Sequence, residues 1–276
     1  MTGSGWPVRD GRFGIVRADG DLFSWHKAHA ERLDVQIDDP DVWVSQTQGP
    51  RSLLRSSVLR AVVLDGPMPD PFCYFGCAKV SIAGQTCWIS RSRLINELGR
   101  EVYLLLNTDI AAIGDRMTEV AAAFGNLATG TPVFRARRIE ARLLNVGSDF
   151  GAQNTPFDPG FGGFVEFDDH DFAGRRALAA ADRSCRAWGM RMSGGVAQQG
   201  RVMTTDGKAV GRVCSSGYAP YQDGGVCIMG MDDPAQGPGT QVDVICADGS
   251  PRAVKFAPCR CMTPTGSFRA ASWWMF

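Results

Sequence analysis

The alternation of apolar and polar positions divides the chain into a mixed first part and a strand-rich second part. Helical spacing of apolar residues predicts helices over 21–33, 50–64, 109–124 and 172–188, and period-two alternation predicts strands over 11–17, 42–46 and 101–106. Residues 190–258 contain short strand-like runs separated by Asp-Gly turns, which is typical of a small β barrel or sandwich. We therefore predict an α+β protein with two domains, residues 1–182 and 183–276.

Turn and capping residues refine these elements. Two strands over 73–91 flank Ala83-Gly84-Gln85, which predicts a hairpin. Pro50 stands at the favoured first position of its helix, and Thr108 or Asp109 caps the helix that Gly125 ends. Residues 147–163 are rich in Gly, Asn, Pro and Asp and predict an ordered loop.

Composition and charge narrow the function. Lys+Arg and Asp+Glu number 29 each, so no basic stripe points to nucleic acid. The apolar runs are too short to span a membrane and no secretory signal is visible, so we expect a cytoplasmic protein without a membrane partner. The cysteines number nine, and their spacing favours buried apolar thiols over a composite thiolate metal site. We therefore predict no metal.

Four segments, and the order in which they occur along the chain, indicate a family resemblance. They are Gln46–Ser52, the run from Ile89 to Tyr103, the stretch from Arg138-Ile139-Glu140-Ala141 to Asp171–Arg175, and the run from Asp206 to Pro220. Together they resemble the glycine-cleavage T-protein (aminomethyltransferase) family, which includes dimethylsulfoniopropionate demethylase. The segments are similar to that family's "LQGPKS", "ISRTGYTGEDGFEIY", "RLEAG…GND" and "VGxVTSGxxSP" motifs.

The resemblance implies an aminomethyltransferase-like folate-binding domain followed by a small C-terminal β-barrel domain, within a three-lobed ring. It also implies tetrahydrofolate as cofactor and transfer of a one-carbon unit from a small methylated metabolite to its N5 atom. Family members carry roughly a hundred residues before the point where this chain begins, so we expect the first lobe to be incomplete here. A protein partner or a homo-oligomer is then expected to complete it.

The same alignment nominates site residues. Glu97 matches the family's pterin-binding Glu, and a carboxylate can accept two parallel pterin N–H bonds. Glu101 matches the second Glu of that motif, with a structural role equally open. Arg138 matches the Arg of "RLEAG" and is expected to contact an anion of the folate or the substrate, or else to pair with Glu140 or Asp149. The further nominations are Arg93 and Asn96 beside the cofactor, and Arg135 and Asp149 beside the substrate.

Departures from the family keep two alternatives open. "GYTG" becomes Arg93-Leu94-Ile95-Asn96, so two glycines that allow close approach to a flat ligand are replaced. The alternatives are a folate-binding or structural subunit without turnover, and a fold recruited for a folate-free reaction in specialised metabolism. His26 and His29 have helical metal spacing but no evident third ligand, and no hydrolase elbow or phosphate loop is present.

Overall fold

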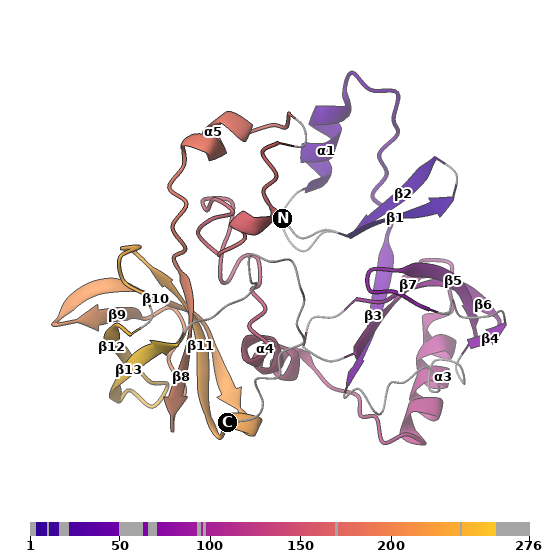
Figure 1. Ribbon diagram of the computed structural model, residues 1–276. Coiled ribbons are helices and arrows are strands. Elements are labelled where there is room, and N and C mark those ends of the chain that lie inside the picture. The colour runs from indigo at the N-terminus through magenta and orange to yellow at the C-terminus, as the bar shows by residue number, and fades with distance from the viewer. Residues whose placement is uncertain are drawn as a thin grey trace. The chain divides into compact units, whose positions relative to one another are not determined.

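The computed structural model describes residues 4–9, 11–16, 22–49, 63–65, 71–92, 95, 98–168, 171–237 and 239–257. The chain forms two compact units, Met1–Thr131 and Pro132–Phe276, which are described in turn (Figure 1).

A five-stranded antiparallel sheet forms the centre of the first unit. Its strands are β3 (Val42–Gly49), β7 (Leu98–Leu105), β6 (Gln85–Ser90), β5 (Cys77–Ile82) and β4 (Val63–Asp65), in that order. Helix α3 (Ile110–Ala122) packs on one face, where Ile113 meets Ile82, Ile89 and Val102. The opposite face carries the polar residues of β3, β6 and β7, because side chains alternate along a strand.

The local signals of this unit act as the sequence predicts. Residues 83 and 84 form the two-residue loop between β5 and β6, and both have positive φ, 52° and 74°. That combination matches the right-handed twist of a hairpin. Asp109 caps α3 by accepting a hydrogen bond from the Ala112 amide at 3.0 Å. Gly125, at φ 70°, follows the end of the helix.

The remaining elements of the unit are a hairpin and a short helix. Strands β1 (Ser4–Arg9) and β2 (Arg12–Val16) form a two-stranded sheet, followed by α1 (Leu22–Ala30). The predicted helix over 50–64 is wrong at its end, because Val63 and Leu64 belong to β4 and Val63 pairs with Ile82. The rest of that prediction, residues 50–62, lies outside the described residues.

The second unit contains six strands hydrogen-bonded in the closed order β10-β11-β8-β13-β12-β9. They are β8 (Ala187–Ser193), β9 (Val202–Thr205), β10 (Lys208–Ala219), β11 (Gly224–Met231), β12 (Gln241–Ile245) and β13 (Pro251–Ala257). The ring closes between β12 and β9 through one residue pair, Asp243 and Thr204. Apolar side chains fill its interior, among them Met192, Met229 and Val244.

Two helix predictions differ from the structure of this unit. The predicted helix over 172–188 is reduced to α5 (Arg175–Ala180), because residue 187 already begins β8. Met190 and Met192 alternate into the core there, and this strand pairing outweighs the helical spacing of the preceding residues. Helix α4 (Thr131–Glu140) was not predicted. Short 3-10 turns, η1 (Gly162–Phe164) and η2 (Pro220–Gln222), complete the unit.

Residues 132–182 pack with the strands of the second unit. Ile139 and Leu144 join Cys214, Ala219 and Ile228 in one apolar cluster. The predicted domain boundary at residue 182 marks the point where the strand-rich sequence pattern begins. The compact units of the structure divide after residue 131 instead. None of the helices in the described part of the chain is long and apolar enough to span a bilayer.

Candidate functional site

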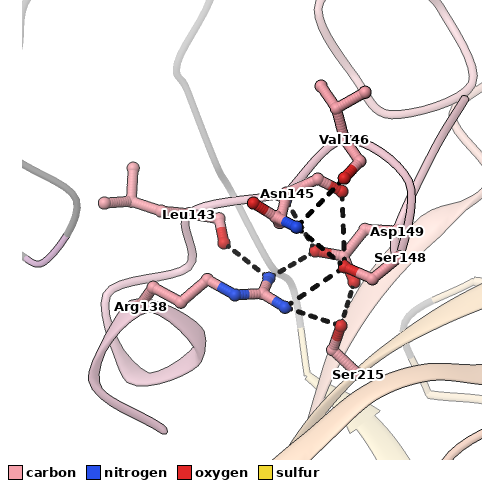
Figure 2. A network of polar contacts seen from close by, with 7 residues as sticks. All are labelled: Arg138, Leu143, Asn145, Val146, Ser148, Asp149 and Ser215. Carbon is pink, nitrogen blue, oxygen red and sulfur yellow. Dashed lines mark hydrogen bonds and ion pairs between the residues drawn. The ribbon is translucent and has the colours of Figure 1, made fainter. Parts of the chain in front are cut away.

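Two polar clusters bring together residues of the predicted site, one in each unit. The Arg138 cluster, in the second unit, consists of Arg138, Asn145, Ser148, Asp149 and Ser215 (Figure 2). The Glu101 cluster, in the first unit, consists of Gln46, Ser90, Ser92, Glu101 and Tyr103.

The Arg138 guanidinium is surrounded by acceptors. It donates through Nη1 to the Leu143 carbonyl at 3.1 Å and to the Asp149 carboxylate. Through Nη2 it donates to Ser215 at 2.7 Å and to Ser148 at 3.4 Å. Figure 2 shows these groups pointing toward one another from α4, the 143–149 loop and β10. All four N–H bonds of the two terminal nitrogens therefore have partners.

The Asp149 carboxylate is equally engaged. Its Oδ2 accepts from the Asn145 amide at 2.8 Å as well as from Arg138, and its Oδ1 accepts from the Ser215 hydroxyl. The Arg138 and Asp149 side chains are 5% and 0% exposed, so the pair is shielded from water. The ion pair with Asp149 is one of the alternatives that the sequence left open. Contact of either residue with folate or substrate stays a prediction.

The packing of α4 against β10 explains why this pair is buried. A Cβ added at Gly217 of β10 would lie 3.3 Å from the Ala136 Cα of α4. A glycine therefore lets helix and strand approach closely, which places Arg138 over Ser215. Arg135, one turn earlier on α4, is exposed and points to no described partner.

The Glu101 cluster lies on the sheet face opposite α3. Glu101 Oε2 accepts from the Tyr103 hydroxyl at 2.7 Å, from Ser90 at 3.4 Å and from Ser92, and Oε1 accepts from Gln46 Nε2 at 2.8 Å. Every described donor is neutral, and no cation among the described residues forms an ion pair with Glu101. Burial, the largest effect, raises the pKa of Tyr103, and the neighbouring Glu101 raises it further. The phenol therefore stays protonated and donates to the carboxylate.

A chain of side-chain amides connects this carboxylate to the loop before β7. Gln46 Oε1 accepts from Gln48 Nε2 at 3.2 Å, and Gln48 Oε1 accepts from the Ile95 backbone amide at 3.0 Å. Gln46, Gln48 and Glu101 share one sheet face because Gln46 pairs directly with Glu101. The three further predicted residues of this loop, Arg93, Asn96 and Glu97, lie outside the described residues.

Sequence reasoning missed the hydroxyl and amide partners of both clusters. Gln46, Gln48, Ser90 and Tyr103 stood within the quoted motifs but received no role. Strand alternation carries the signal that would have found them, because residues 46 and 48 share a face and Ser90 pairs with Glu101. Ser215 was considered only a barrel position. No local sequence pattern indicates that it contacts Arg138, which lies 77 positions earlier in the chain.

Metal-binding chemistry finds no support in the described part of the chain, where no group of His, Cys, Asp and Glu is arranged to hold an ion. The described cysteines are free thiols. Burial raises the pKa of Cys77 and of Cys87 to about 11, so both stay protonated at neutral pH.

Comparisons with known proteins agree with these elements. The model of the GCVT N-terminal domain matches residues 10–169. The chain belongs to the GCVT N-terminal domain family. Dimethylsulfoniopropionate demethylase of Ruegeria pomeroyi is 30% identical to this GCVT-family chain over 242 residues, which are 84% of the chain and 64% of the relative. An aminomethyltransferase of Caldanaerobacter subterraneus is 26% identical over 238 residues, 84% of the chain and 62% of the relative.

A solved structure extends the agreement to the fold. The glycine cleavage system aminomethyltransferase T from Bartonella henselae superposes with a TM-score of 0.69 at 20% identity, covering 87% of this chain and 65% of that protein. The GCVT-family chain therefore has an aminomethyltransferase-like fold with mixed α and β content. It spans 62–65% of the length of these relatives.

Proposed function

We propose that this chain binds tetrahydrofolate and takes part in transfer of a methyl or aminomethyl group from a small methylated metabolite, as one subunit of a complex. The observation that carries the proposal is the Glu101 cluster, whose members other than Gln46 lie within the motif that resembles the family's pterin-binding segment. The names of the relatives, a demethylase and aminomethyltransferases, support the reaction class.

The carboxylate acceptors of this region match the N–H donors of a folate. A pterin presents a row of N–H donors, and a carboxylate is the acceptor that matches them in a bidentate pair. Glu97 is the residue we assign to that role. Glu101 Oε1 has one described donor, Gln46, and so keeps a lone pair for a further N–H. When bound, tetrahydrofolate supplies N5 as the nucleophile that accepts the one-carbon unit.

The chain's own residues then act mainly by positioning. The amides of Gln46 and Gln48 link the Glu101 carboxylate to the Ile95 backbone, two residues before Glu97. This linkage limits the conformations of the Ile95 backbone, and limiting them lowers the entropic cost of orienting a ligand. Arg93, Asn96, Arg135, Arg138 and Asp149 are the further residues we assign to the ligand region.

Isothermal titration with tetrahydrofolate tests the proposal. We expect binding by the wild-type protein and its loss in Glu97→Ala. Glu119→Ala, which removes an exposed carboxylate on α3, is the matched control and is expected to bind as the wild type does. An unchanged affinity in Glu97→Ala would remove the site assignment, and absence of binding in the wild type would remove the folate.

The first unit also supports the proposal of a partner. Phe13 and Ile15 of β2 are 71% and 58% exposed, and they share one face of a two-stranded sheet. A hairpin of two strands is marginal in water by itself, so a covering surface would stabilise it. Native mass spectrometry of the chain purified from its own organism distinguishes a second polypeptide from a homo-oligomer, and a strictly monomeric species would contradict both.

A second candidate is a folate-binding or structural subunit without turnover. The Arg138 cluster favours it, because two family-motif positions satisfy each other in a buried ion pair. The assembled complex separates the candidates. Transfer of a methyl group from dimethylsulfoniopropionate or another methylated donor to tetrahydrofolate supports the enzyme. Folate binding without transfer by the complete complex supports the second candidate.

A further inference from the structure

A cavity of about 560 Å³ lies in the first unit, and none of its lining residues belongs to the Glu101 cluster. Its lining comes from β2, β5, β6, the end of β7 and the turn that follows, and consists of Arg12, Lys79, Gln85, Thr86, Trp88, Leu105, Asn107 and Thr108. The volume lies in the range of small-molecule sites, about 300–1,000 Å³.

The charge of the lining indicates an anionic ligand. Two of the lining side chains, Arg12 and Lys79, are cationic, and none is a carboxylate. Arg12 donates to Asp38 at 3.0 Å, which fixes its guanidinium and offsets its charge. Lys79 is exposed and has no acidic partner among the described residues. A lysine ammonium in this position attracts a carboxylate as a compact point charge.

An aromatic surface lies beside this charge. Trp88 and Leu105 are the large apolar residues of the lining. Trp88 stands directly opposite Lys79 on β5 and opposite Tyr103 on β7, so the indole, the ammonium and the phenol share one face of the sheet. An indole presents a broad ring face on which a planar ligand stacks. The cavity therefore combines a stacking surface with a cation.

The rim of the cavity is held in place. Gln85 Oε1 accepts from the Asp109 amide at 2.6 Å, and Gln85 Nε2 donates to the Asp109 carbonyl at 3.2 Å. These two bonds attach the turn after β7 to β6. Asn107 and Thr108 precede Asp109, so their polar side chains are presented by an anchored turn rather than by a mobile one.

The cavity also continues the face that carries the Glu101 cluster. Tyr103 donates to Glu101 on one side and pairs with Trp88 on the other. Along this face, Glu101 is a hydrogen-bond acceptor, Trp88 is a ring on which a ligand can stack, and Lys79 is a cation that can pair with a carboxylate. An extended ligand with N–H donors at one end, then an aromatic ring, and a carboxylate at the other end matches this order.

We propose that the cavity binds, through Lys79 and Trp88, a ligand that joins an aromatic ring to an aliphatic carboxylate. Within the proposed function, on which this part rests, that ligand is the aminobenzoyl-glutamate portion of tetrahydrofolate. Lys79 contacts a glutamate carboxylate and Trp88 stacks on the benzoyl ring.

Isothermal titration with N-(4-aminobenzoyl)-L-glutamate tests the cavity by itself. We expect binding by the wild type, with affinity lowered about tenfold in Lys79→Met and about tenfold in Trp88→Leu, in line with typical losses of a charge partner or a stacking surface. Lys208→Met is the matched control, because Lys208 is an exposed lysine on a strand of the second unit. Lys79 is exposed, so Lys79→Met is expected to fold. Equal affinity in wild type and Lys79→Met would overturn the proposal, as would absence of binding.

Tetrahydropterin, which lacks the aminobenzoyl-glutamate portion, separates this inference from the proposed function. We expect it to bind equally to wild type and Lys79→Met, whereas tetrahydrofolate loses about tenfold in the variant. If tetrahydrofolate and tetrahydropterin bind with the same affinity to both proteins, the cavity assignment is wrong and folate binding stands. If N-(4-aminobenzoyl)-L-glutamate binds but neither tetrahydrofolate nor tetrahydropterin does, the cavity binds a smaller aromatic ligand with an aliphatic carboxylate and the folate proposal fails.

Discussion

The Arg138 cluster and the Glu101 cluster use the same kind of group, a carboxylate held by hydroxyl donors, in opposite ways. At Asp149 the carboxylate meets a guanidinium, and both side chains are almost fully buried. At Glu101 the described donors to the carboxylate are neutral, and the carboxylate lies on the sheet face opposite α3. In the Arg138 cluster the charged groups pair with each other. In the Glu101 cluster the carboxylate has no described counter-charge, and its Oε1 atom can accept a further hydrogen bond.

The difference teaches that a motif position does not fix a role. Arg138 and Asp149 both match family motifs, yet here they connect α4, the 143–149 loop and β10 into one structural unit. Glu101 also matches a motif, and its neighbours connect it through two glutamines to the loop before β7. We therefore expect substitutions in the first cluster to reduce stability, and substitutions in the second to reduce ligand affinity more than stability.

The largest expected effect follows from Asp149→Ala. This change leaves the Arg138 guanidinium buried without its counter-charge, which costs about 3–5 kcal/mol. Urea denaturation followed by circular dichroism measures the free energy of unfolding. Asp171→Ala, at an exposed position, is the control and is expected to change stability by less than about 0.5 kcal/mol.

The double variant Arg138→Met/Asp149→Leu sharpens the same test. Removing both charges eliminates the unpaired ion, so the double variant is expected to be more stable than Asp149→Ala. A loss below about 1 kcal/mol in Asp149→Ala would contradict a structural role for the pair, because unpaired buried charges cost more than that.

Glu101→Gln is expected to cost less. The substitution keeps the shape but turns hydrogen bonds to an anion into bonds to a neutral amide, a loss of about 1.5–3 kcal/mol in stability at most. Its effect on tetrahydrofolate affinity is expected to be at least tenfold, because the ligand loses a charged acceptor. The control is Glu119→Gln on α3, whose exposed pair with Arg116 contributes less than about 1 kcal/mol. A loss of stability with unchanged tetrahydrofolate affinity would place Glu101 with the structural cluster.

The sequence predicted most of the first unit because its signals are local. The hairpin at residues 83–84 and the Asp109 cap follow from residues that are adjacent in the chain. The helix over 172–188 failed for the opposite reason, since the strand pairing of residues 187–193 depends on β11 and β13. Local spacing contains no information about those partners.

The candidate site shows the same division. Glu101, Arg138 and Asp149 were found through motifs, which are runs of neighbouring residues. Ser215 was missed because its contact with Arg138 joins positions 77 residues apart, and Gln48 was missed because its contact with Ile95 spans 47. Hydrogen bonds of this kind depend on strand register and helix packing, which sequence spacing alone does not determine.

The alkylation rates of two cysteines, Cys77 near the Glu101 cluster and Cys214 near the Arg138 cluster, compare how accessible the two clusters are to solvent. Cys77 pairs with Ser90 on the Glu101 face, is partly exposed, and burial raises its pKa to about 11. Its alkylation rate is therefore expected to rise nearly tenfold from pH 9 to 10, as the thiolate fraction does below that pKa. Burial also raises the pKa of Cys214, which lies beside Asp149.

Cys214 is fully packed, so its alkylation requires local opening, and an opened thiol with an ordinary pKa near 8.5 is already mostly ionised at pH 9. Its rate is expected to change less than twofold over the same interval. Iodoacetamide labelling with peptide mass spectrometry measures both rates. A steep rise at Cys214, equal to that at Cys77, would show that the Arg138 cluster is as open as the Glu101 cluster.

The smallest expected change in stability comes from Gln48→Ala. The variant loses the acceptor for the Ile95 amide at 3.0 Å and the donor to Gln46 at 3.2 Å, which is expected to cost about 1 kcal/mol. The Ile95 backbone then loses its connection to Glu101. Tetrahydrofolate affinity is expected to fall about tenfold, since fixing the Ile95 backbone is now a cost of binding. Gln153→Ala, at an exposed loop position, controls for removal of a glutamine amide. An unchanged affinity with reduced stability would mean that the two glutamines only brace the sheet, and the contrast between an open and a closed cluster would then rest on burial alone.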